Sequence, residues 1–171
     1  MITIRPENKE DLSTIKNVND KAFGQPEEGN VINKIRKSDS QILSLVAEIE
    51  GSIVGHIFYS EAKIDCNNVS IKGMGLAPMA VLPEYQKQGI GKKLIIDSLE
   101  MLNTKDIPFI IVLGHEEYYP KFGFEKASKY DIKCQWKGVP DEAFMIMILD
   151  KEKMANIHGV ATYRDEWNEA M

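Results

Sequence analysis

The hydrophobic pattern of the first third of the chain changes from alternation to helical spacing and back. Isoleucine alternates with polar residues over 2–6, which predicts a strand that ends at Pro6, because proline has no N–H to donate to a strand ladder. Apolar residues at steps of three and four predict a helix over 11–23, and a second helix is expected over 30–37. The segment 43–60 contains two β-rich runs around a Glu-Gly-Ser turn, which predicts a hairpin.

The middle of the chain has the pattern of a strand, a helix and a parallel strand. Nearly every residue over 73–82 is apolar, as in a strand buried on both faces, and 89–102 places its apolar residues on one helical stripe. A short apolar strand over 109–113 follows, so the unit should have a right-handed crossover. The remaining expected elements are a short helix and two strands, at 116–122, from 124 onwards and at 143–149.

Length and composition favour one domain. A chain of 171 residues, 43% of them hydrophobic, can bury a core without metals or disulfides, and we predict a single domain over 1–150. The charged and weakly periodic segment 151–171 is predicted to be a C-terminal tail, either helical or disordered. Cys66 and Cys134 lie far apart and form no disulfide framework, so we expect free thiols in a reducing compartment.

Charge and hydropathy argue against several classes of function. A net charge of -5 disfavours broad binding of nucleic acid or of an anionic membrane by the domain as a whole. No stretch approaches the roughly 20 apolar residues that span a bilayer, and the N-terminus lacks a signal-peptide pattern, so we expect a cytoplasmic protein. Histidines, cysteines and carboxylates do not cluster at ligand spacing, which predicts no metal site.

The chemically informative segment is the turn between the buried strand and the long helix. Gln86, Gly89 and Gly91 stand there in a Q-x-x-G-x-G arrangement. The first turn of a helix has unpaired N–H groups and the positive end of the helix dipole, and glycines let a phosphate approach them. Three lysines add positive charge beside the turn, at positions 87, 92 and 93. This pattern predicts a pyrophosphate site.

Two other interpretations of the glycines stay open. They could serve only to shape a tight turn between strand and helix, since glycine-rich turns have many uses. The loop could also bind ATP or a dinucleotide, but neither the Walker pattern G-x-x-x-x-G-K-(S/T) nor the dinucleotide pattern G-x-G-x-x-G is written here.

The segment VLPEYQKQGIGKKLI resembles the acyl-CoA-binding motif of the GNAT superfamily of N-acetyltransferases, whose pattern is (R/Q)-x-x-G-x-(G/A). The order of elements over 1–150 is also similar, and VLGHEEYYPKFGF resembles the corresponding segment of the bacterial YhbS-like group within this family. The resemblance implies an α/β (α+β) fold with a mixed, mostly antiparallel central sheet of six to seven strands and about four flanking helices. A parallel βαβ unit would lie at the cofactor site.

The resemblance also assigns a cosubstrate, acetyl-CoA, and the residues that hold it. Backbone groups of Met79, Ala80 and Val81 would pair with the pantetheine arm as a further strand does. The pyrophosphate would lie on the turn that follows, formed by Gln86, Lys87, Gln88, Gly89, Ile90, Gly91 and Lys92.

A second motif, Y-x-x-x-G-F, implies a catalytic acid. Tyr119 matches the family tyrosine that protonates or hydrogen-bonds the departing thiolate, and a phenol with a pKa near ~10 carries its proton at neutral pH. A packed aromatic residue is the alternative interpretation. Many relatives have a glutamate as base on the fourth strand, but 73–82 contains no acidic residue. His115 and Glu116 are candidate bases by position, and either could instead be a solvated loop residue.

The predicted function is transfer of an acetyl group from acetyl-CoA to a primary amine by direct attack in a ternary complex. The alternative is a catalytically silent CoA-binding regulatory module. The acceptor is a small-molecule, peptide or protein amine, and its pocket is expected near the loops at 23–33 and 117–136, which can vary while the fold persists. Resemblance to the family makes a homodimer possible.

Overall fold

The computed structural model describes all 171 residues, and the chain divides into two compact units. Unit 1 comprises Met1–Ser60, Ala77–Met101 and Asp165–Met171, and unit 2 comprises Glu61–Leu76 and Leu102–Arg164. Two long strands, β3 (Ser52–Cys66) and β4 (Val69–Val81), and the helix α3 (Ile90–Asn103) contribute residues to both units.

Unit 1 contains the predicted N-terminal strand and hairpin. The strand β1 (Ile2–Pro6) pairs antiparallel with β2 (Ile42–Ile49), and β2 pairs antiparallel with β3. The register of β2 and β3 shifts between Ala47 and Glu48, as at a β-bulge. Strand β4 is a neighbour of β3 in the sheet, and just after β4 the N–H of Leu82 donates to the carbonyl of Val54 at 2.9 Å.

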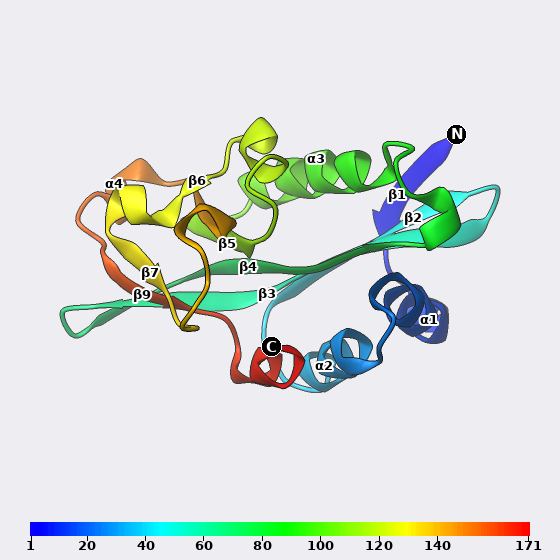
Figure 1. The fold of residues 1–171 in the computed structure, drawn as a ribbon, viewed down its shortest axis with the longest axis horizontal. Helices are drawn as coiled ribbons and strands as arrows, with labels where there is room; N and C mark the ends of the chain where they lie inside the picture. The colour runs from blue at the N-terminus through cyan, green and yellow to red at the C-terminus, as the bar shows by residue number, and fades with distance from the viewer. The chain divides into compact units, whose positions relative to one another are not determined.

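Helices cover both faces of the unit 1 strands. After a short turn η1 (Lys9–Asp11), helices α1 (Leu12–Phe23) and α2 (Glu27–Arg36) lie on one face and α3 lies on the other (Figure 1). Successive β3 residues reflect this arrangement: a Cβ at Gly55 would touch Ile90 of α3, whereas His56 contacts Asn19 of α1. The buried aliphatic side chains of the three helices include Ile15, Val18, Val31, Ile32, Ile35, Leu94 and Ile95.

Helix α2 begins earlier than the expected range 30–37. Its N-cap is Pro26, and Glu27 and Glu28 occupy its first turn. Carboxylates are favourable there because the first turn carries the positive end of the helix dipole. The apolar spacing marks only the buried stripe of this helix, so it could not locate the polar first turn.

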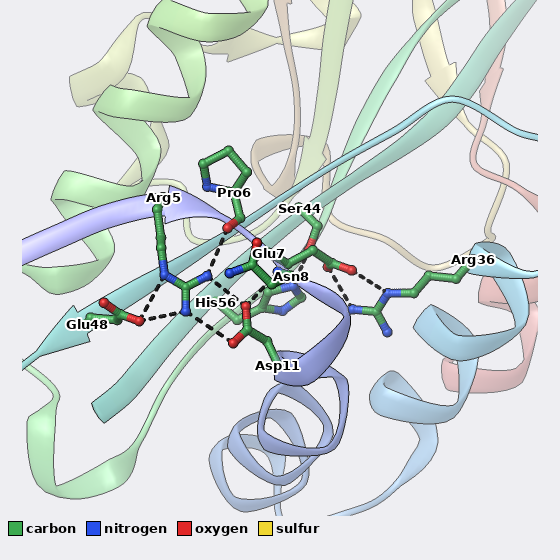
Figure 2. A network of polar contacts seen from close by, with 9 residues as sticks. All are labelled: Arg5, Pro6, Glu7, Asn8, Asp11, Arg36, Ser44, Glu48 and His56. Carbon is green, nitrogen blue, oxygen red and sulfur yellow. Dashed lines mark hydrogen bonds and ion pairs between the residues drawn. The ribbon is translucent and has the colours of Figure 1, made fainter. Parts of the chain in front are cut away.

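A polar network ties the first residues of unit 1 together (Figure 2). Arg5 of β1 binds Asp11 at 2.7 Å and Glu48 of β2 at 2.6 Å, and Arg36 of α2 binds Glu7 at 2.8 Å. The hydrogen bond from Arg5 lowers the pKa of Asp11. The network therefore joins β1, β2 and the start of α1 through ionised side chains.

Unit 2 contains the parallel pair that the sequence predicted. Residues Met74 to Leu76 of β4 pair in parallel with Ile110 to Val112 of β5 (Phe109–Leu113). On the far side of β5 lies the antiparallel strand β8 (Phe144–Ile148), which also pairs with β6 (Glu125–Lys126). The short helical turns are η3 (Tyr119–Phe122), η4 (Ala127–Tyr130) and η5 (Asp141–Ala143). The expected fold class, mixed and mostly antiparallel, is confirmed.

The sheet has nine strands, against the six to seven expected. Two strands were not anticipated: β9 (Gly159–Thr162) pairs antiparallel with β3 and in parallel with the short β7 (Ile132–Cys134). The segment after Asp150 contains α4 (Lys151–Met154), β9 and η6 (Asp165–Ala170). In unit 1, η6 lies beside α2 (Figure 1). Its Trp167 donates to the hydroxyl of Ser60 in β3 at 3.3 Å. None of the helices is long and apolar enough to cross a membrane.

Candidate functional site

The predicted pyrophosphate loop lies in unit 1, between β4 and α3. The chain leaves β4 at Val81, makes the turn η2 (Pro83–Tyr85) and then extends at Gln86. The side-chain amide of Gln86 donates to the carbonyl of Val81 at 3.0 Å, and its own N–H donates to Pro83 at 3.4 Å. Gln88 donates to Glu84 at 3.3 Å. Both glutamine side chains therefore fold the loop on itself.

Gly89 provides the backbone conformation that starts α3. Its φ is +87°, in the left-handed region, and a Cβ built on it meets no atom within 4 Å. The carbonyl of Gly89 accepts from the N–H of Lys93 at 3.1 Å. The three N–H groups before that of Lys93 belong to the first turn of α3, at Ile90, Gly91 and Lys92. No residue lies four positions earlier within the helix to accept them. Together with the helix dipole, these N–H groups are suited to hold an anion, and the space beside Gly89 is open.

The three lysines of this region differ in their partners. Lys93 lies 3.1 Å from Asp97 one turn along α3, which partly neutralises its charge. Lys87 and Lys92 are exposed and form no ion pair. The positive charge available to a bound anion therefore comes mainly from Lys87 and Lys92.

The end of β4 offers free backbone groups on one side. Because the N–H of Leu82 points toward β3, the alternation of a strand directs the backbone groups of Met79 and Val81 away from β3. The carbonyl of Val81 accepts from the side chain of Gln86. The groups on this side that remain for a partner are the N–H of Val81 and the N–H and carbonyl of Met79. The side chain of Ala80 is buried at 2% exposure, and its neighbours are half-buried. This geometry suits an extended partner that binds like a strand.

The predicted acid, Tyr119, lies in unit 2 at the start of η3. Its ring is 7% exposed and makes edge-on contacts with Tyr118 and Phe124, at centroid distances of 5.2 and 5.7 Å. The turn is fixed by its backbone, since the N–H groups of Tyr118 and Tyr119 both donate to the carbonyl of His115, at 3.1 and 3.4 Å. Gly123 ends the turn with a φ of +104°.

The environment of Tyr119 keeps its phenol protonated. Burial raises the pKa of Tyr119 to about 12, and the neighbouring Tyr118 adds to the effect. The group is therefore a hydrogen-bond donor throughout the neutral and mildly alkaline range.

The candidate bases also lie in unit 2. His115 and Glu116 come after Gly114, the first residue beyond β5, and both side chains are exposed. His115 contacts the turn with its backbone carbonyl, which accepts from the N–H groups of Tyr118 and Tyr119, and not with its imidazole. Their role as bases stays a prediction. The cofactor-loop residues thus belong to unit 1, and the candidate acid and bases belong to unit 2.

Tyr163, which no sequence pattern signalled, reaches the end of the parallel pair in unit 2. Its hydroxyl donates to the carbonyls of Leu76 at 3.0 Å and Ile111 at 3.4 Å, and its ring stacks on Trp136 at 5.6 Å. A Cβ at Gly75 would lie 2.5 Å from this ring, so glycine makes room for it. Nothing in a lone tyrosine within a charged segment signals such a contact.

Sequence comparison finds a matching family model and similar proteins. A family model described as the acetyltransferase (GNAT) domain matches residues 3–127. The uncharacterized N-acetyltransferase YhbS of Escherichia coli (strain K12) is 28% identical over 149 residues, which cover 86% of this chain and 87% of that protein. The uncharacterized N-acetyltransferase YjhQ of the same organism is 38% identical over 122 residues, which cover 70% of this chain and 67% of that protein.

Two solved structures are similar over nearly the whole chain. The GNAT family N-acetyltransferase YhbS from Escherichia coli, in complex with CoA, matches with a TM-score of 0.89 at 27% identity and covers 98% of this chain and 92% of that one. A GNAT family acetyltransferase from Brucella melitensis, in complex with acetyl-CoA, matches with a TM-score of 0.79 at 28% identity and covers 98% of each chain. The likeness therefore extends into the C-terminal segment that the family model does not match.

Proposed function

The chain belongs to the GNAT acetyltransferase family, and from this premise we propose that it transfers the acetyl group of acetyl-CoA to a primary amine by direct attack in a ternary complex. The two similar structures bind CoA and acetyl-CoA, which supports the choice of cosubstrate. The observation that carries the proposal is the start of α3, where unpaired N–H groups lie behind Gly89 beside two unpaired lysines.

In this proposal the cofactor binds unit 1 in two places. The pyrophosphate lies on the loop from Lys87 to Lys92, whose N–H groups and lysine charges balance its negative charge. The pantetheine arm runs along the free edge of β4 and uses the backbone groups of Met79 and Val81. The bound thioester is thereby held in one orientation, which supplies the entropic part of the rate enhancement.

The chemistry requires one proton to be removed and one negative charge to be stabilised. The amine nitrogen forms a bond to the thioester carbonyl carbon, the C–S bond breaks, and the proton of the attacking nitrogen goes to a base, for which His115 and Glu116 are the candidates. The electron pair of the C–S bond leaves on sulfur as a thiolate. An ordinary thiol has a pKa near ~8.5, so transfer of a proton from a phenol with a pKa of about 12 to that thiolate is uphill. The proposed role of Tyr119 is therefore to donate a hydrogen bond to the departing sulfur.

Calorimetric titration with acetyl-CoA tests the binding half of this proposal, with two glycine variants for comparison. Gly89→Glu places a carboxylate and a strained backbone at the start of α3. Gly138→Glu is the matched control, because Gly138 has a φ of +81° and equally open surroundings but belongs to unit 2 and not to the loop from Lys87 to Lys92. Wild type and Gly138→Glu should bind, and Gly89→Glu should not. Equal binding by all three would show that the loop does not hold the pyrophosphate.

Release of free CoA thiol tests the transfer half. Amines of several classes, including a polyamine, an amino acid, an aminoglycoside and a peptide with a free N-terminus, are each added to the protein with acetyl-CoA. Amine-dependent thiol release identifies the acceptor class. Tight binding of acetyl-CoA with no release for any amine would favour the regulatory module, for which the absence of a carboxylate in β4 is the supporting observation.

A further inference from the structure

We propose that Gly114 is a positioning residue for Tyr119, an inference that rests on the proposed role of Tyr119 in transfer. Gly114 directly follows β5 in unit 2. A Cβ built on Gly114 would lie 2.3 Å from Cε2, 2.9 Å from Cδ2 and 3.3 Å from Cζ of the Tyr119 ring. Carbon atoms in contact are ordinarily about 3.5–4.0 Å apart, so the ring fills the space that any side chain at 114 would need.

Both partners in this contact are held in place by other bonds. The N–H of Gly114 donates to the carbonyl of Ala143 at 2.9 Å, and Leu113 pairs with Phe144 of β8. The Tyr119 ring is enclosed by Tyr118 and Phe124, and its N–H is bound to the carbonyl of His115. A side chain at 114 can therefore be accommodated only if the ring moves from its position.

Movement of the ring displaces the hydroxyl, because the hydroxyl is attached to Cζ, one of the three atoms in the contact. A hydrogen bond is effective only over a narrow range of donor–acceptor distance, and a misplacement of about 1 Å is enough to cost catalysis. The glycine is not required by the backbone, since the φ of Gly114 lies outside the left-handed region. An alanine at this position therefore changes the packing of Tyr119 and adds no backbone strain.

A double-mutant cycle on amine-dependent thiol release tests the inference, with Gly114→Ala, Tyr119→Phe and the double variant. Tyr119→Phe keeps the ring and removes only the hydroxyl, and it should lower kcat by roughly 10²-fold, as expected for one transition-state donor. Gly114→Ala should lower kcat by a similar factor with little change in the KM for acetyl-CoA. The double variant should be no slower than Tyr119→Phe, because a hydroxyl that is already absent cannot be misplaced.

Three outcomes would overturn the inference, and each is distinct from failure of the proposed function. If Gly114→Ala has the kcat of the wild type, the ring tolerates the Cβ. If the loss of kcat caused by Gly114→Ala multiplies with the loss caused by Tyr119→Phe in the double variant, the glycine acts through general stability. If Tyr119→Phe alone has the kcat of the wild type, Tyr119 has no role to position, although acetyl transfer itself stands. Failure of the proposed function would appear earlier, as absence of amine-dependent release by the wild type.

The contact can also be tested without turnover, which matters if Gly114→Ala is too unstable for kinetics. The free energy of unfolding is measured for Gly114→Ala in the wild-type background and in a Tyr119→Ala background. The alanine at 114 should destabilise the wild type and cost clearly less when the ring is absent. An equal cost in both backgrounds would overturn the contact.

Discussion

The Nε2 atom of His56 lies 2.8 Å from the Oγ of Ser44, inside unit 1 (Figure 2). The other ring nitrogen, Nδ1, lies 3.1 Å from the amide nitrogen of Asn19, which also donates to the carbonyl of Ile15 at 2.9 Å. An amide nitrogen can only donate, so Nδ1 accepts and the proton of the neutral ring is on Nε2, where it donates to Ser44. The histidine is fully buried and joins α1, β2 and β3 in its neutral form.

The first prediction is that His56 makes unfolding sensitive to mild acid. Burial, with a smaller effect of the Arg36 charge, lowers the pKa of His56 to about 3. Below about pH 6.5, which is the ordinary pKa of histidine, the unfolded chain gains a proton that the folded protein does not. The free energy of unfolding therefore falls as the pH falls from about 6.5 toward 3, by up to about 1.4 kcal/mol per pH unit. Denaturant unfolding at a series of pH values measures this slope.

The comparison for this prediction is His56→Gln, which can keep polar contacts but cannot be protonated. Its free energy of unfolding should depend less on pH between about 4.5 and 6.5 than that of the wild type. Asp11, whose pKa is lowered, also loses its stabilising contribution in acid, but this loss comes as the pH falls below 3.8, the ordinary pKa of an aspartate. If the free energy of unfolding of the two proteins changes equally with pH between about 4.5 and 6.5, His56 is not held neutral by burial.

The second prediction separates two adjacent lysines at the start of α3. Lys92 forms no ion pair, whereas Lys93 lies 3.1 Å from Asp97. Lys92→Ala should weaken binding of acetyl-CoA by about 1 kcal/mol, or roughly fivefold in Kd, and the effect should shrink as salt is added. Lys93→Ala should have a smaller effect, because Asp97 already offsets its charge. Equal effects in calorimetric titrations would contradict the proposed orientation of charge in the loop.

Sequence patterns were most informative where the structure depends on neighbours in the chain. Helix α3 and strand β5 lie within a residue or so of the expected ranges, because one apolar stripe and one apolar run determine them. The glycines at 89 and 91 also marked the strand-to-helix turn, in which Gly89 has a φ of +87°, although no pattern in the sequence predicted that angle. For such elements the local sequence contains most of the information.

Contacts between distant segments were not predictable in this way. Strand β9 lies in a segment without strong alternation, and it forms because β3 and β7 offer open edges on either side. The space at Gly114 is filled by a ring five positions along the chain, and no pattern of residue types specifies which side chain fills it. The exposed positions of His115 and Glu116 give no preference between the two as a base.

The third prediction concerns the hydroxyl of Tyr163, which bonds to two carbonyls at the end of the parallel pair. Tyr163→Phe keeps the ring but leaves those buried carbonyls with one donor fewer, which should cost about 1–3 kcal/mol in the free energy of unfolding. Tyr130→Phe is the matched control in unit 2. Its hydroxyl donates to Glu125 at 2.6 Å, but that carboxylate is near solvent and should recover a water partner at smaller cost. Denaturant unfolding of both variants should rank Tyr163→Phe as the less stable, and the reverse order would contradict this account.

The last prediction concerns the alkaline side of the rate profile. Only the protonated phenol of Tyr119 can donate to the departing sulfur, and with a pKa of about 12 that form is lost only at higher pH. Once non-enzymatic reaction of the thioester is subtracted, kcat should therefore show no loss attributable to Tyr119 between about pH 8 and 10. Tyr119→Phe should be slower than the wild type by the same factor at every pH in this range. A loss of wild-type kcat within the range that is missing from Tyr119→Phe would show that Tyr119 ionises there, and that burial does not hold its proton as the structure implies.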